Sequence, residues 1–256
     1  MLPTLIRLLL GRRLPLTQGD LRLPGPRESI SIHRDRYDVP HIEAQNDADA
    51  WFALGFCQGQ DRAFQLELLL RTARGTLAAL VGKGGLGIDR LSRRVGLREA
   101  SLRQLPVLEP ELRANVEAFA RGVNAGVRRG VRGRPHELVL FAARPTRWDA
   151  ADVLGVAKLI SMLLIGNWDV ELARLKILSL DGPQALRDLD PAYPESHVVT
   201  APPGMLAGPA LDRLSDDIAA FVGVAGRSGG SNNWAVAGSR TASGRPILAN
   251  DPHLEP

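Results

Sequence analysis

A serine that directly follows two glycines occupies the position in this chain that best suits covalent chemistry. The run is Gly229-Gly230-Ser231, and a strand pattern begins at Ser231. Because Gly230 has no Cβ, a neighbouring group can approach its backbone closely, and the Ser231 hydroxyl could attack its carbonyl. Attack would give an ester, and hydrolysis would leave a new chain that starts with Ser231. Its free α-amine, with an ordinary pKa of about 7.7–8.0, would be a general base beside the nucleophile.

The same three residues also allow a simpler interpretation. Gly-Gly-Ser is the usual composition of a flexible linker, so residues 229–231 alone leave linker and self-cleaving nucleophile both open. The residues that follow favour the nucleophile. The run from Ser231 to Leu254, SNNWAVAGSRTASGRPILANDPHL, closely resembles the start of the β subunit in the penicillin acylase family of N-terminal-nucleophile amidohydrolases.

A second resemblance, to the α subunit of the same family, runs through the N-terminal part of the chain. The matching segments are Arg34-Asp35, Val39–Ile42, Phe56–Leu68, Ala73–Gly75 and Trp148–Asp152. Together the two resemblances cover nearly the whole chain apart from its N-terminal end. They imply an α+β fold, the family's four-layer αββα sandwich. This chain would hold only the mainly helical α-subunit part and the first β-hairpin of the β subunit.

The resemblance also implies how the chain is divided. Residues 1–25 would be an N-terminal lead-in, 26–199 an α-subunit-like region, 200–230 a spacer that is removed, and 231–256 the start of the β subunit. Family precursors are inactive until they cut themselves before the nucleophilic serine, here at the Gly230–Ser231 bond. The α and β subunits thus come from one precursor. The family's oxyanion-stabilising donors lie far downstream in the β subunit, so we expect this piece alone to be inactive.

Two residues are expected to act in catalysis. The resemblance implies that Ser231 attacks the carbonyl of a small-molecule linear amide, forms an acyl-enzyme and is freed by water. The acyl side chain of a β-lactam or an N-acyl-homoserine lactone would be such a substrate. His253 matches a histidine that contacts the nucleophilic serine in the cephalosporin and homoserine-lactone acylase branches. Its alternative is a loop histidine that simply follows Asp251-Pro252.

Three apolar residues and one glutamate complete the set that the resemblance singles out. Met162, Leu164 and Ile165 end a predicted helix where the family lines its acyl pocket, although they would equally suit an ordinary core. Glu171 aligns with an α-subunit glutamate that ligates one structural calcium ion, with the other oxygens from the β subunit. Calcium takes about six to eight oxygen ligands, so a surface charge is the alternative role of Glu171. No organic cofactor is implied.

Composition and charge exclude several classes of protein. The chain has 256 residues, 45% of them hydrophobic, which is too apolar for a disordered protein. The net charge is only +4, from 32 Lys and Arg against 28 Asp and Glu, and the arginine pairs are scattered. We therefore expect a solvated basic surface and no nucleic-acid partner. The single cysteine, Cys57, excludes an internal disulfide and is expected to be a small core residue.

Localisation is left open by the N-terminus. No run of about 18 apolar residues is present, so we expect no integral membrane segment. Residues 1–10 are apolar, but Arg7 interrupts them and no clear signal peptide results. The family resemblance points to a periplasmic or secreted protein, whereas the N-terminus alone leaves a cytoplasmic one possible.

A glycine cluster and a rival function are the two alternatives to an amidohydrolase without a nucleotide site. The glycine cluster 82–87 lacks the spacing of a phosphate loop and follows a helical pattern, so no nucleotide site is expected. The rival function is a non-catalytic helical module that binds a partner, or an inactive gene fragment.

Periodicity predicts a mainly helical chain up to about residue 220 and a β-hairpin after it. Residues 29–33 alternate like a strand that 37–42 continue. Helices are predicted from the cap at 46–49 through Cys57, from 61 to about 80, over 109–129, from 149–152 to 164, over 170–180 and over 212–222. The hairpin pairs 231–237 with 246–249 across a turn at 241–244. It is too small to be stable alone, so it calls for further strands.

Two of these helices carry apolar stripes, and one charged pair lies between apolar residues. The stripes are Trp51, Leu54 and Cys57 on the first helix and Leu112, Val116, Phe119 and Val123 on the helix over 109–129. Asp61 and Arg62 are charged residues in an apolar stretch, and we expect a structural role for them because an unbonded buried pair would be costly.

Overall fold

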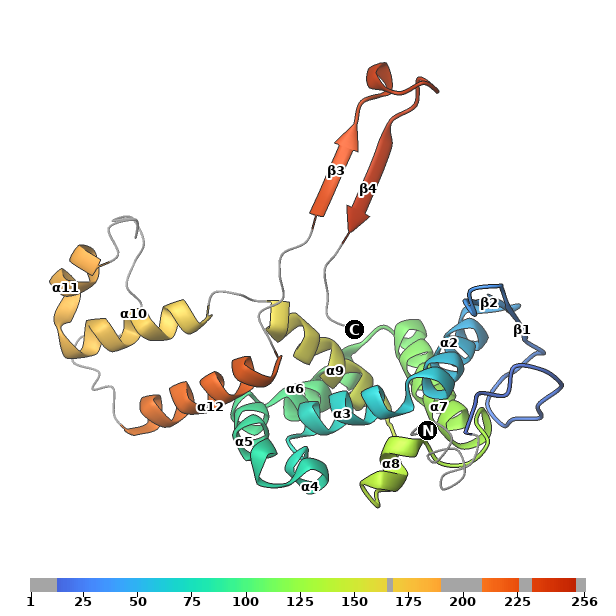
Figure 1. Ribbon diagram of the computed structural model, residues 1–256, viewed down its shortest axis with the longest axis horizontal. Helices are drawn as coiled ribbons and strands as arrows, with labels where there is room; N and C mark the ends of the chain where they lie inside the picture. Colours follow the sequence, from blue (N-terminus) through green and yellow to red (C-terminus); the bar gives the residue numbers. More distant parts are fainter. Residues whose placement is uncertain (1–12, 165–167, 190–208, 226–231, 252–256) are drawn as a thin grey trace, which may run out of the picture. The chain divides into compact units, whose positions relative to one another are not determined.

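The computed structural model describes residues 13–164, 168–189, 209–225 and 232–251 (Figure 1). The chain divides into two compact units, 1–218 and 219–256. The helices of the first unit are α2 (Asp47–Asp61), α3 (Ala63–Arg74), α4 (Ala78–Val81), α5 (Leu86–Val95), α6 (Leu97–Gln104), α7 (Pro110–Arg129), α8 (His136–Leu140), α9 (Ala150–Leu164), α10 (Trp168–Leu180) and α11 (Gly182–Leu189). Its strands are β1 (Ser31–Arg34) and β2 (Pro40–Glu43). Helix α12 (Pro209–Ala225) begins in the first unit, and the second unit contains β3 (Asn232–Val236) and β4 (Ile247–Asp251).

Strands β1 and β2 form an antiparallel hairpin, with Ile32 opposite Ile42. The prediction that residues 37–42 continue the strand begun at 29–33 is therefore wrong. The Asp35 carboxylate turns the chain back, because it accepts hydrogen bonds from the backbone N–H groups of Tyr37 at 2.8 Å and Val39 at 3.0 Å. Pro40 is tolerated because it is the first residue of β2.

Helix α2 starts where the sequence predicts it. The side chain of Asn46 accepts a hydrogen bond from the Asp49 backbone N–H at 3.0 Å, which satisfies one of the free donors at the helix start. The helices predicted over 109–129 and up to Leu164 are confirmed as α7 and α9.

Helices α2 and α7 lie side by side along a seam of glycines (Figure 1). A Cβ atom built on Gly55 would lie 2.3 Å from the carbonyl oxygen of Phe119, and one on Gly122 would lie 2.0 Å from that of Phe52. Gly59 and Gly126 meet the facing backbone in the same way. The two backbones are thus in direct contact, which only residues without a side chain permit.

The glycine seam changes which apolar residues form the core. Phe52, Phe56, Cys57, Ala118 and Val123 are buried, so two members of the predicted stripes are confirmed. The other predicted stripe residues lie outside this core. Trp51 and Leu112 are exposed, and Leu54, Val116 and Phe119 are half-buried.

The helix predicted from 61 to 80 is two helices, α3 and α4. Gly75 ends α3 with a left-handed backbone at φ 66°. The Asp89 carboxylate of α5 then accepts hydrogen bonds from the N–H groups of Leu77 at 2.6 Å and Ala78 at 2.9 Å, where α4 begins. The prediction continued the helix as far as the exposed glycines near residue 82. It missed the break at Gly75 because the contact with Asp89 of α5 is not visible in the local sequence. Helices α5, α6, α8 and α11 were not predicted, and α12 is longer than predicted.

The second unit contains the predicted β-hairpin. Strand β3 pairs antiparallel with β4, from Asn232 opposite Asp251 to Val236 opposite Ile247. Trp234 and Leu248 are exposed within the described part of the chain, as expected for a two-stranded sheet with apolar side chains. Among the described helices, none is both long and apolar enough to cross a membrane.

Candidate active site

The predicted nucleophile stands next to a well-defined strand. Gly230, Ser231 and His253 lie outside the described residues. Their places in the chain are informative nonetheless: Ser231 directly precedes Asn232, and His253 comes two residues after Asp251. Since Asn232 and Asp251 are opposite each other, the serine and the histidine are attached to the same end of the hairpin.

The predicted acyl-pocket residues lie at the C-terminal end of α9. Met162 is half-buried, Leu164 is 59% exposed and Ile165 lies outside the described residues. The neighbouring Ile160 and Leu163 are also exposed. This end of α9 thus presents apolar side chains at the surface of the described part, and Leu164 is not a core residue there. A role in acyl binding stays a prediction.

The predicted calcium ligand, Glu171, lies on α10 with its side chain 55% exposed. Its Oε1 accepts a hydrogen bond from Arg174 Nη1 at 2.6 Å. Within the described ranges, no group of three or more His, Cys, Asp or Glu side chains could hold a metal ion. The described residues therefore do not by themselves fit a calcium ion, and Glu171 as a ligand stays a prediction.

The segments that resemble the α subunit meet in polar contacts of the helical body, in which Arg34 and Gln60 are largely buried and Asp61 is exposed. Arg34 at the end of β1 donates to Gln60 Oε1 at 2.8 Å and to both Asp61 oxygens at 2.9 Å. Gln60 in turn donates to the carbonyl oxygens of Leu16 and Gly130 at 2.7 Å. Asp61 therefore has the expected structural role, but its partner is Arg34.

Glu67 makes a second such contact, inside α3. Its carboxylate is buried and accepts hydrogen bonds from the Thr146 hydroxyl at 2.6 Å, the Thr146 N–H at 2.8 Å and Arg71 Nε at 2.6 Å. The chain just before α9 is thereby attached to α3.

Asp152 makes the third contact and connects three helices. Its fully buried carboxylate accepts two hydrogen bonds from Arg74 of α3, at 2.7 and 2.6 Å, and one from Arg98 of α6 at 2.6 Å. Arg98 also binds Asp149 through two hydrogen bonds, at 2.8 and 2.6 Å. That guanidinium holds the pKa of Asp149 well below its usual range, at about 2. No local sequence pattern predicts this network, because its partners are 51 to 78 residues apart.

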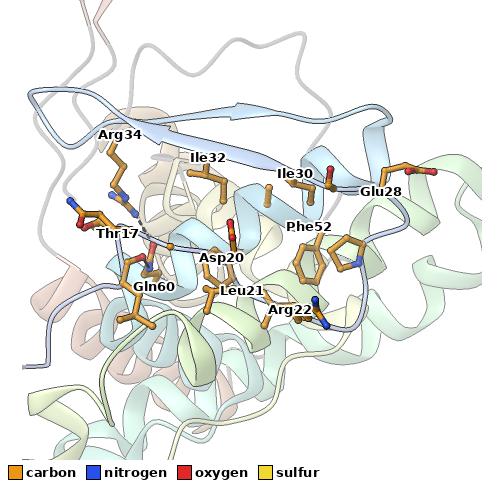
Figure 2. Close-up of a pocket in the computed structure, with 18 residues that line it drawn as sticks. Thr17, Asp20, Leu21, Arg22, Glu28, Ile30, Ile32, Arg34, Phe52 and Gln60 are labelled. Atoms are coloured by element: carbon orange, nitrogen blue, oxygen red, sulfur yellow. Dashed lines mark hydrogen bonds between the residues drawn. The ribbon is translucent and has the colours of Figure 1, made fainter.

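A cavity of about 530 Å³ lies beside this body, between the segment 16–30 and α2 (Figure 2). Ile30, Ile32 and Phe52 supply apolar walls, and the hydrogen-bonded pair Arg34–Gln60 closes one end. The cavity was not predicted from the sequence. Its lining also contains polar residues, namely Thr17, Gln18, Asp20, Arg22, Glu28 and Ser29, so the cavity has a mixed polar and apolar surface.

Comparison with known proteins identifies the family of this chain. The family model for penicillin amidase matches residues 29–256, which include both the helical body and the hairpin. The chain belongs to the penicillin amidase family. Its fold is thus that of a mainly helical fragment of an N-terminal-nucleophile hydrolase with the first β-hairpin, as predicted.

Individual relatives agree with this assignment. The chain is 36% identical over 255 residues to penicillin acylase 2 proenzyme of Pseudomonas sp. strain SE83, covering 94% of this chain and 32% of the relative. It is 35% identical over 249 residues to the acyl-homoserine lactone acylase QuiP of Pseudomonas aeruginosa, covering 94% and 29%. The chain therefore spans about a third of the length of these penicillin amidase relatives.

A solved structure supports the same fold. A chain of the thermostable penicillin G acylase from Alcaligenes faecalis superposes with a TM-score of 0.53 at 28% identity. The match covers 68% of this chain and 95% of that chain. The arginine–carboxylate networks of α3, α6 and α9 thus belong to the helical part of a penicillin amidase fold.

Proposed function

We propose that this chain supplies the α-subunit part and the nucleophile of an amidohydrolase of the penicillin acylase type. One observation carries the proposal: two acylases match 94% of the chain, and the family match extends through Ser231 and the hairpin after it. A helical binding module would not need a match that continues past Gly230 into the start of the β subunit.

The proposed reaction begins with activation of the precursor. The Ser231 hydroxyl attacks the Gly230 carbonyl carbon, the C–N bond between the two residues breaks, and water hydrolyses the resulting ester. The new α-amine of Ser231 then acts as the general base for its own hydroxyl. His253, which follows β4 by two residues, would act beside this serine.

Substrate turnover repeats the same chemistry on a small amide. Ser231 attacks the amide carbonyl, the amine leaves with a proton, and water releases the carboxylic acid from the acyl-enzyme. Donors for the oxyanion must come from residues beyond this sequence, and removing one such donor typically costs about 2.7–4 kcal/mol. We therefore expect residues 1–256 alone to be inactive.

The proposed substrate class is a linear amide with an apolar acyl group. The named relatives are a penicillin acylase and an acyl-homoserine lactone acylase, so the acyl group would come from a β-lactam side chain or an N-acyl-homoserine lactone. The apolar end of α9, with Met162, Leu164 and Ile165, would contact it. If a calcium ion binds, Glu171 would provide one of its oxygen ligands and the ion would have a structural role.

The test is amide hydrolysis by the full-length gene product. Release of free amine from penicillin G and from N-acyl-homoserine lactones of several chain lengths would be measured with wild-type protein, Ser231→Ala and Ser243→Ala. Ser243 is an exposed serine in the hairpin turn and serves as the matched control. We expect activity in the wild type and Ser243→Ala and none in Ser231→Ala. Equal activity in Ser231→Ala would show that another group is the nucleophile, whereas no activity in correctly cut wild type would favour the non-catalytic rival.

A further inference from the structure

Helix α12 lies just upstream of the proposed cleavage bond, in the stretch 200–230 that family resemblance assigns to a removable spacer. Within the first unit, Leu211, Asp217 and Ile218 of this helix are buried. Leu211 and Ile218 are seven residues apart, which places them on one face of the helix. Asp217 directly precedes Ile218 and is only 1% exposed.

Two arginines of α5 hold this carboxylate. Arg90 Nη2 lies 2.8 Å from Asp217 Oδ1, and Arg94 Nη1 lies 2.6 Å from Oδ2. Arg90 and Arg94 are four residues apart and share a face of α5, so each carboxylate oxygen has its own guanidinium. The contact with Asp217 raises the pKa of Arg90 above its ordinary value.

Part of the space between α5 and α12 is not closely packed. A hollow of about 420 Å³, lined by Arg94, Val95, Arg213 and Leu214, lies between the end of α5 and α12. The second ion pair of α12, between Asp212 and Lys176 of α10, has a distance of 3.6 Å and is exposed, so it stabilises little. A buried carboxylate that loses its partners is strongly destabilising, and this makes Asp217 the residue on which docking depends.

We propose that Asp217, Arg90 and Arg94 form a clamp that keeps α12 on the helical body after the precursor is cut, so that the mature α subunit retains α12. This proposal rests on the proposed function, because it assumes cleavage at Gly230–Ser231. It extends the α-subunit part through Ala225 and limits any discarded peptide to residues outside the clamped helix.

The first test is the intact mass of the α chain in the matured full-length protein. We expect an α chain that ends after Ala225. An α chain that ends near residue 199, with Ser231 as the free N-terminus of the β chain, would overturn the clamp and leave the proposed function standing. Absence of any cut before Ser231 would instead overturn the proposed function, and the second test then decides about the clamp.

The second test is hydrogen exchange of residues 211–218 in the chain 1–256. Asp217→Asn should speed exchange of these amides at least about tenfold, because hydrogen bonds to charged groups are worth about 1.5–3 kcal/mol. Asp216→Asn removes the same charge from an exposed neighbour and should behave like the wild type. Arg94→Gln, in a partly exposed arginine, should show a smaller increase. Unchanged exchange in Asp217→Asn and Arg94→Gln, with normal protection of α2 and α7, would refute the clamp.

Discussion

Burial makes the thiol of Cys57 unreactive. Its side chain is 2% exposed among Phe52, Phe56 and Ala118. Burial raises the pKa of the thiol to about 11, while Arg34 lowers it by a smaller amount. A thiolate is the reactive form of cysteine, so this side chain is a packing group and not a second nucleophile.

Cys57 should therefore resist thiol reagents in the folded chain. At pH 8 about one thiol in a thousand would be ionised, against roughly a quarter for an ordinary cysteine. We expect labelling by a disulfide reagent to be at least about 100-fold slower in native protein than in urea-unfolded protein. Rapid stoichiometric labelling of native protein, measured by absorbance, would show that the α2–α7 core opens easily.

The lowered pKa of Asp149 predicts a specific dependence of stability on acid. A carboxyl group whose pKa is lower in the folded state stabilises the fold above its unfolded pKa, and this contribution is lost as pH falls to the folded pKa. The unfolded value is about 3.9 and the folded value is about 2. We expect wild type to exceed Asp149→Asn in unfolding free energy at pH 5, and the difference to shrink between about pH 4 and pH 2.

Urea unfolding at a series of pH values would measure this difference. Asp20→Asn, at an exposed aspartate of the N-terminal segment, controls for the loss of one negative charge. A difference that stays constant down to pH 2 would mean that the Arg98–Asp149 bonds do not form in solution.

At the scale of helices and strands, the glycine seam is the feature that sets how α2 and α7 pack. Gly55 and Gly59 on one helix face Gly122 and Gly126 on the other, and their missing side chains let the backbones touch. An added methyl group at this contact must push the helices apart, because packed interiors have little spare room.

Gly55→Ala should accordingly destabilise the fold by about 1–3 kcal/mol or more. The Cβ would lie 2.3 Å from the Phe119 carbonyl oxygen, which belongs to the backbone and cannot rotate away. Gly84→Ala is the matched control, since a Cβ there meets no heavy atom within 4 Å. Its unfolding free energy in urea should stay within about 0.5 kcal/mol of the wild type or rise. Equal behaviour of the two variants would contradict the seam.

The sequence predicted helices α2, α7, α9 and α10 because their signals are local. The Asn46 cap of α2 and the periodicity of α7 and α9 are each contained in a short window. The failures have the opposite origin. The start of α4 depends on Asp89 of α5, and the core faces of α2 and α7 depend on a glycine contact between two helices, which apolar periodicity does not detect.

At the scale of the whole molecule, the family resemblance carried information that periodicity could not. It assigned the N-terminal helices and the hairpin after Ser231 to one family. The family match over residues 29–256 confirms that assignment. The same comparison could not predict the buried networks, whose partners such as Arg74 and Asp152 lie 78 residues apart. These networks explain how buried carboxylates such as Glu67 and Asp152 are accommodated inside the helical body.

The central claim is that Ser231 becomes the first residue of a new chain by its own chemistry. Intact mass and N-terminal sequencing of the full-length gene product, as wild type and as Ser231→Ala, test it most directly. The account predicts that the wild type yields a chain beginning with Ser231-Asn-Asn-Trp and that Ser231→Ala remains a single uncut chain. A wild type that stays uncut, or a Ser231→Ala variant cut at the same bond, would contradict it.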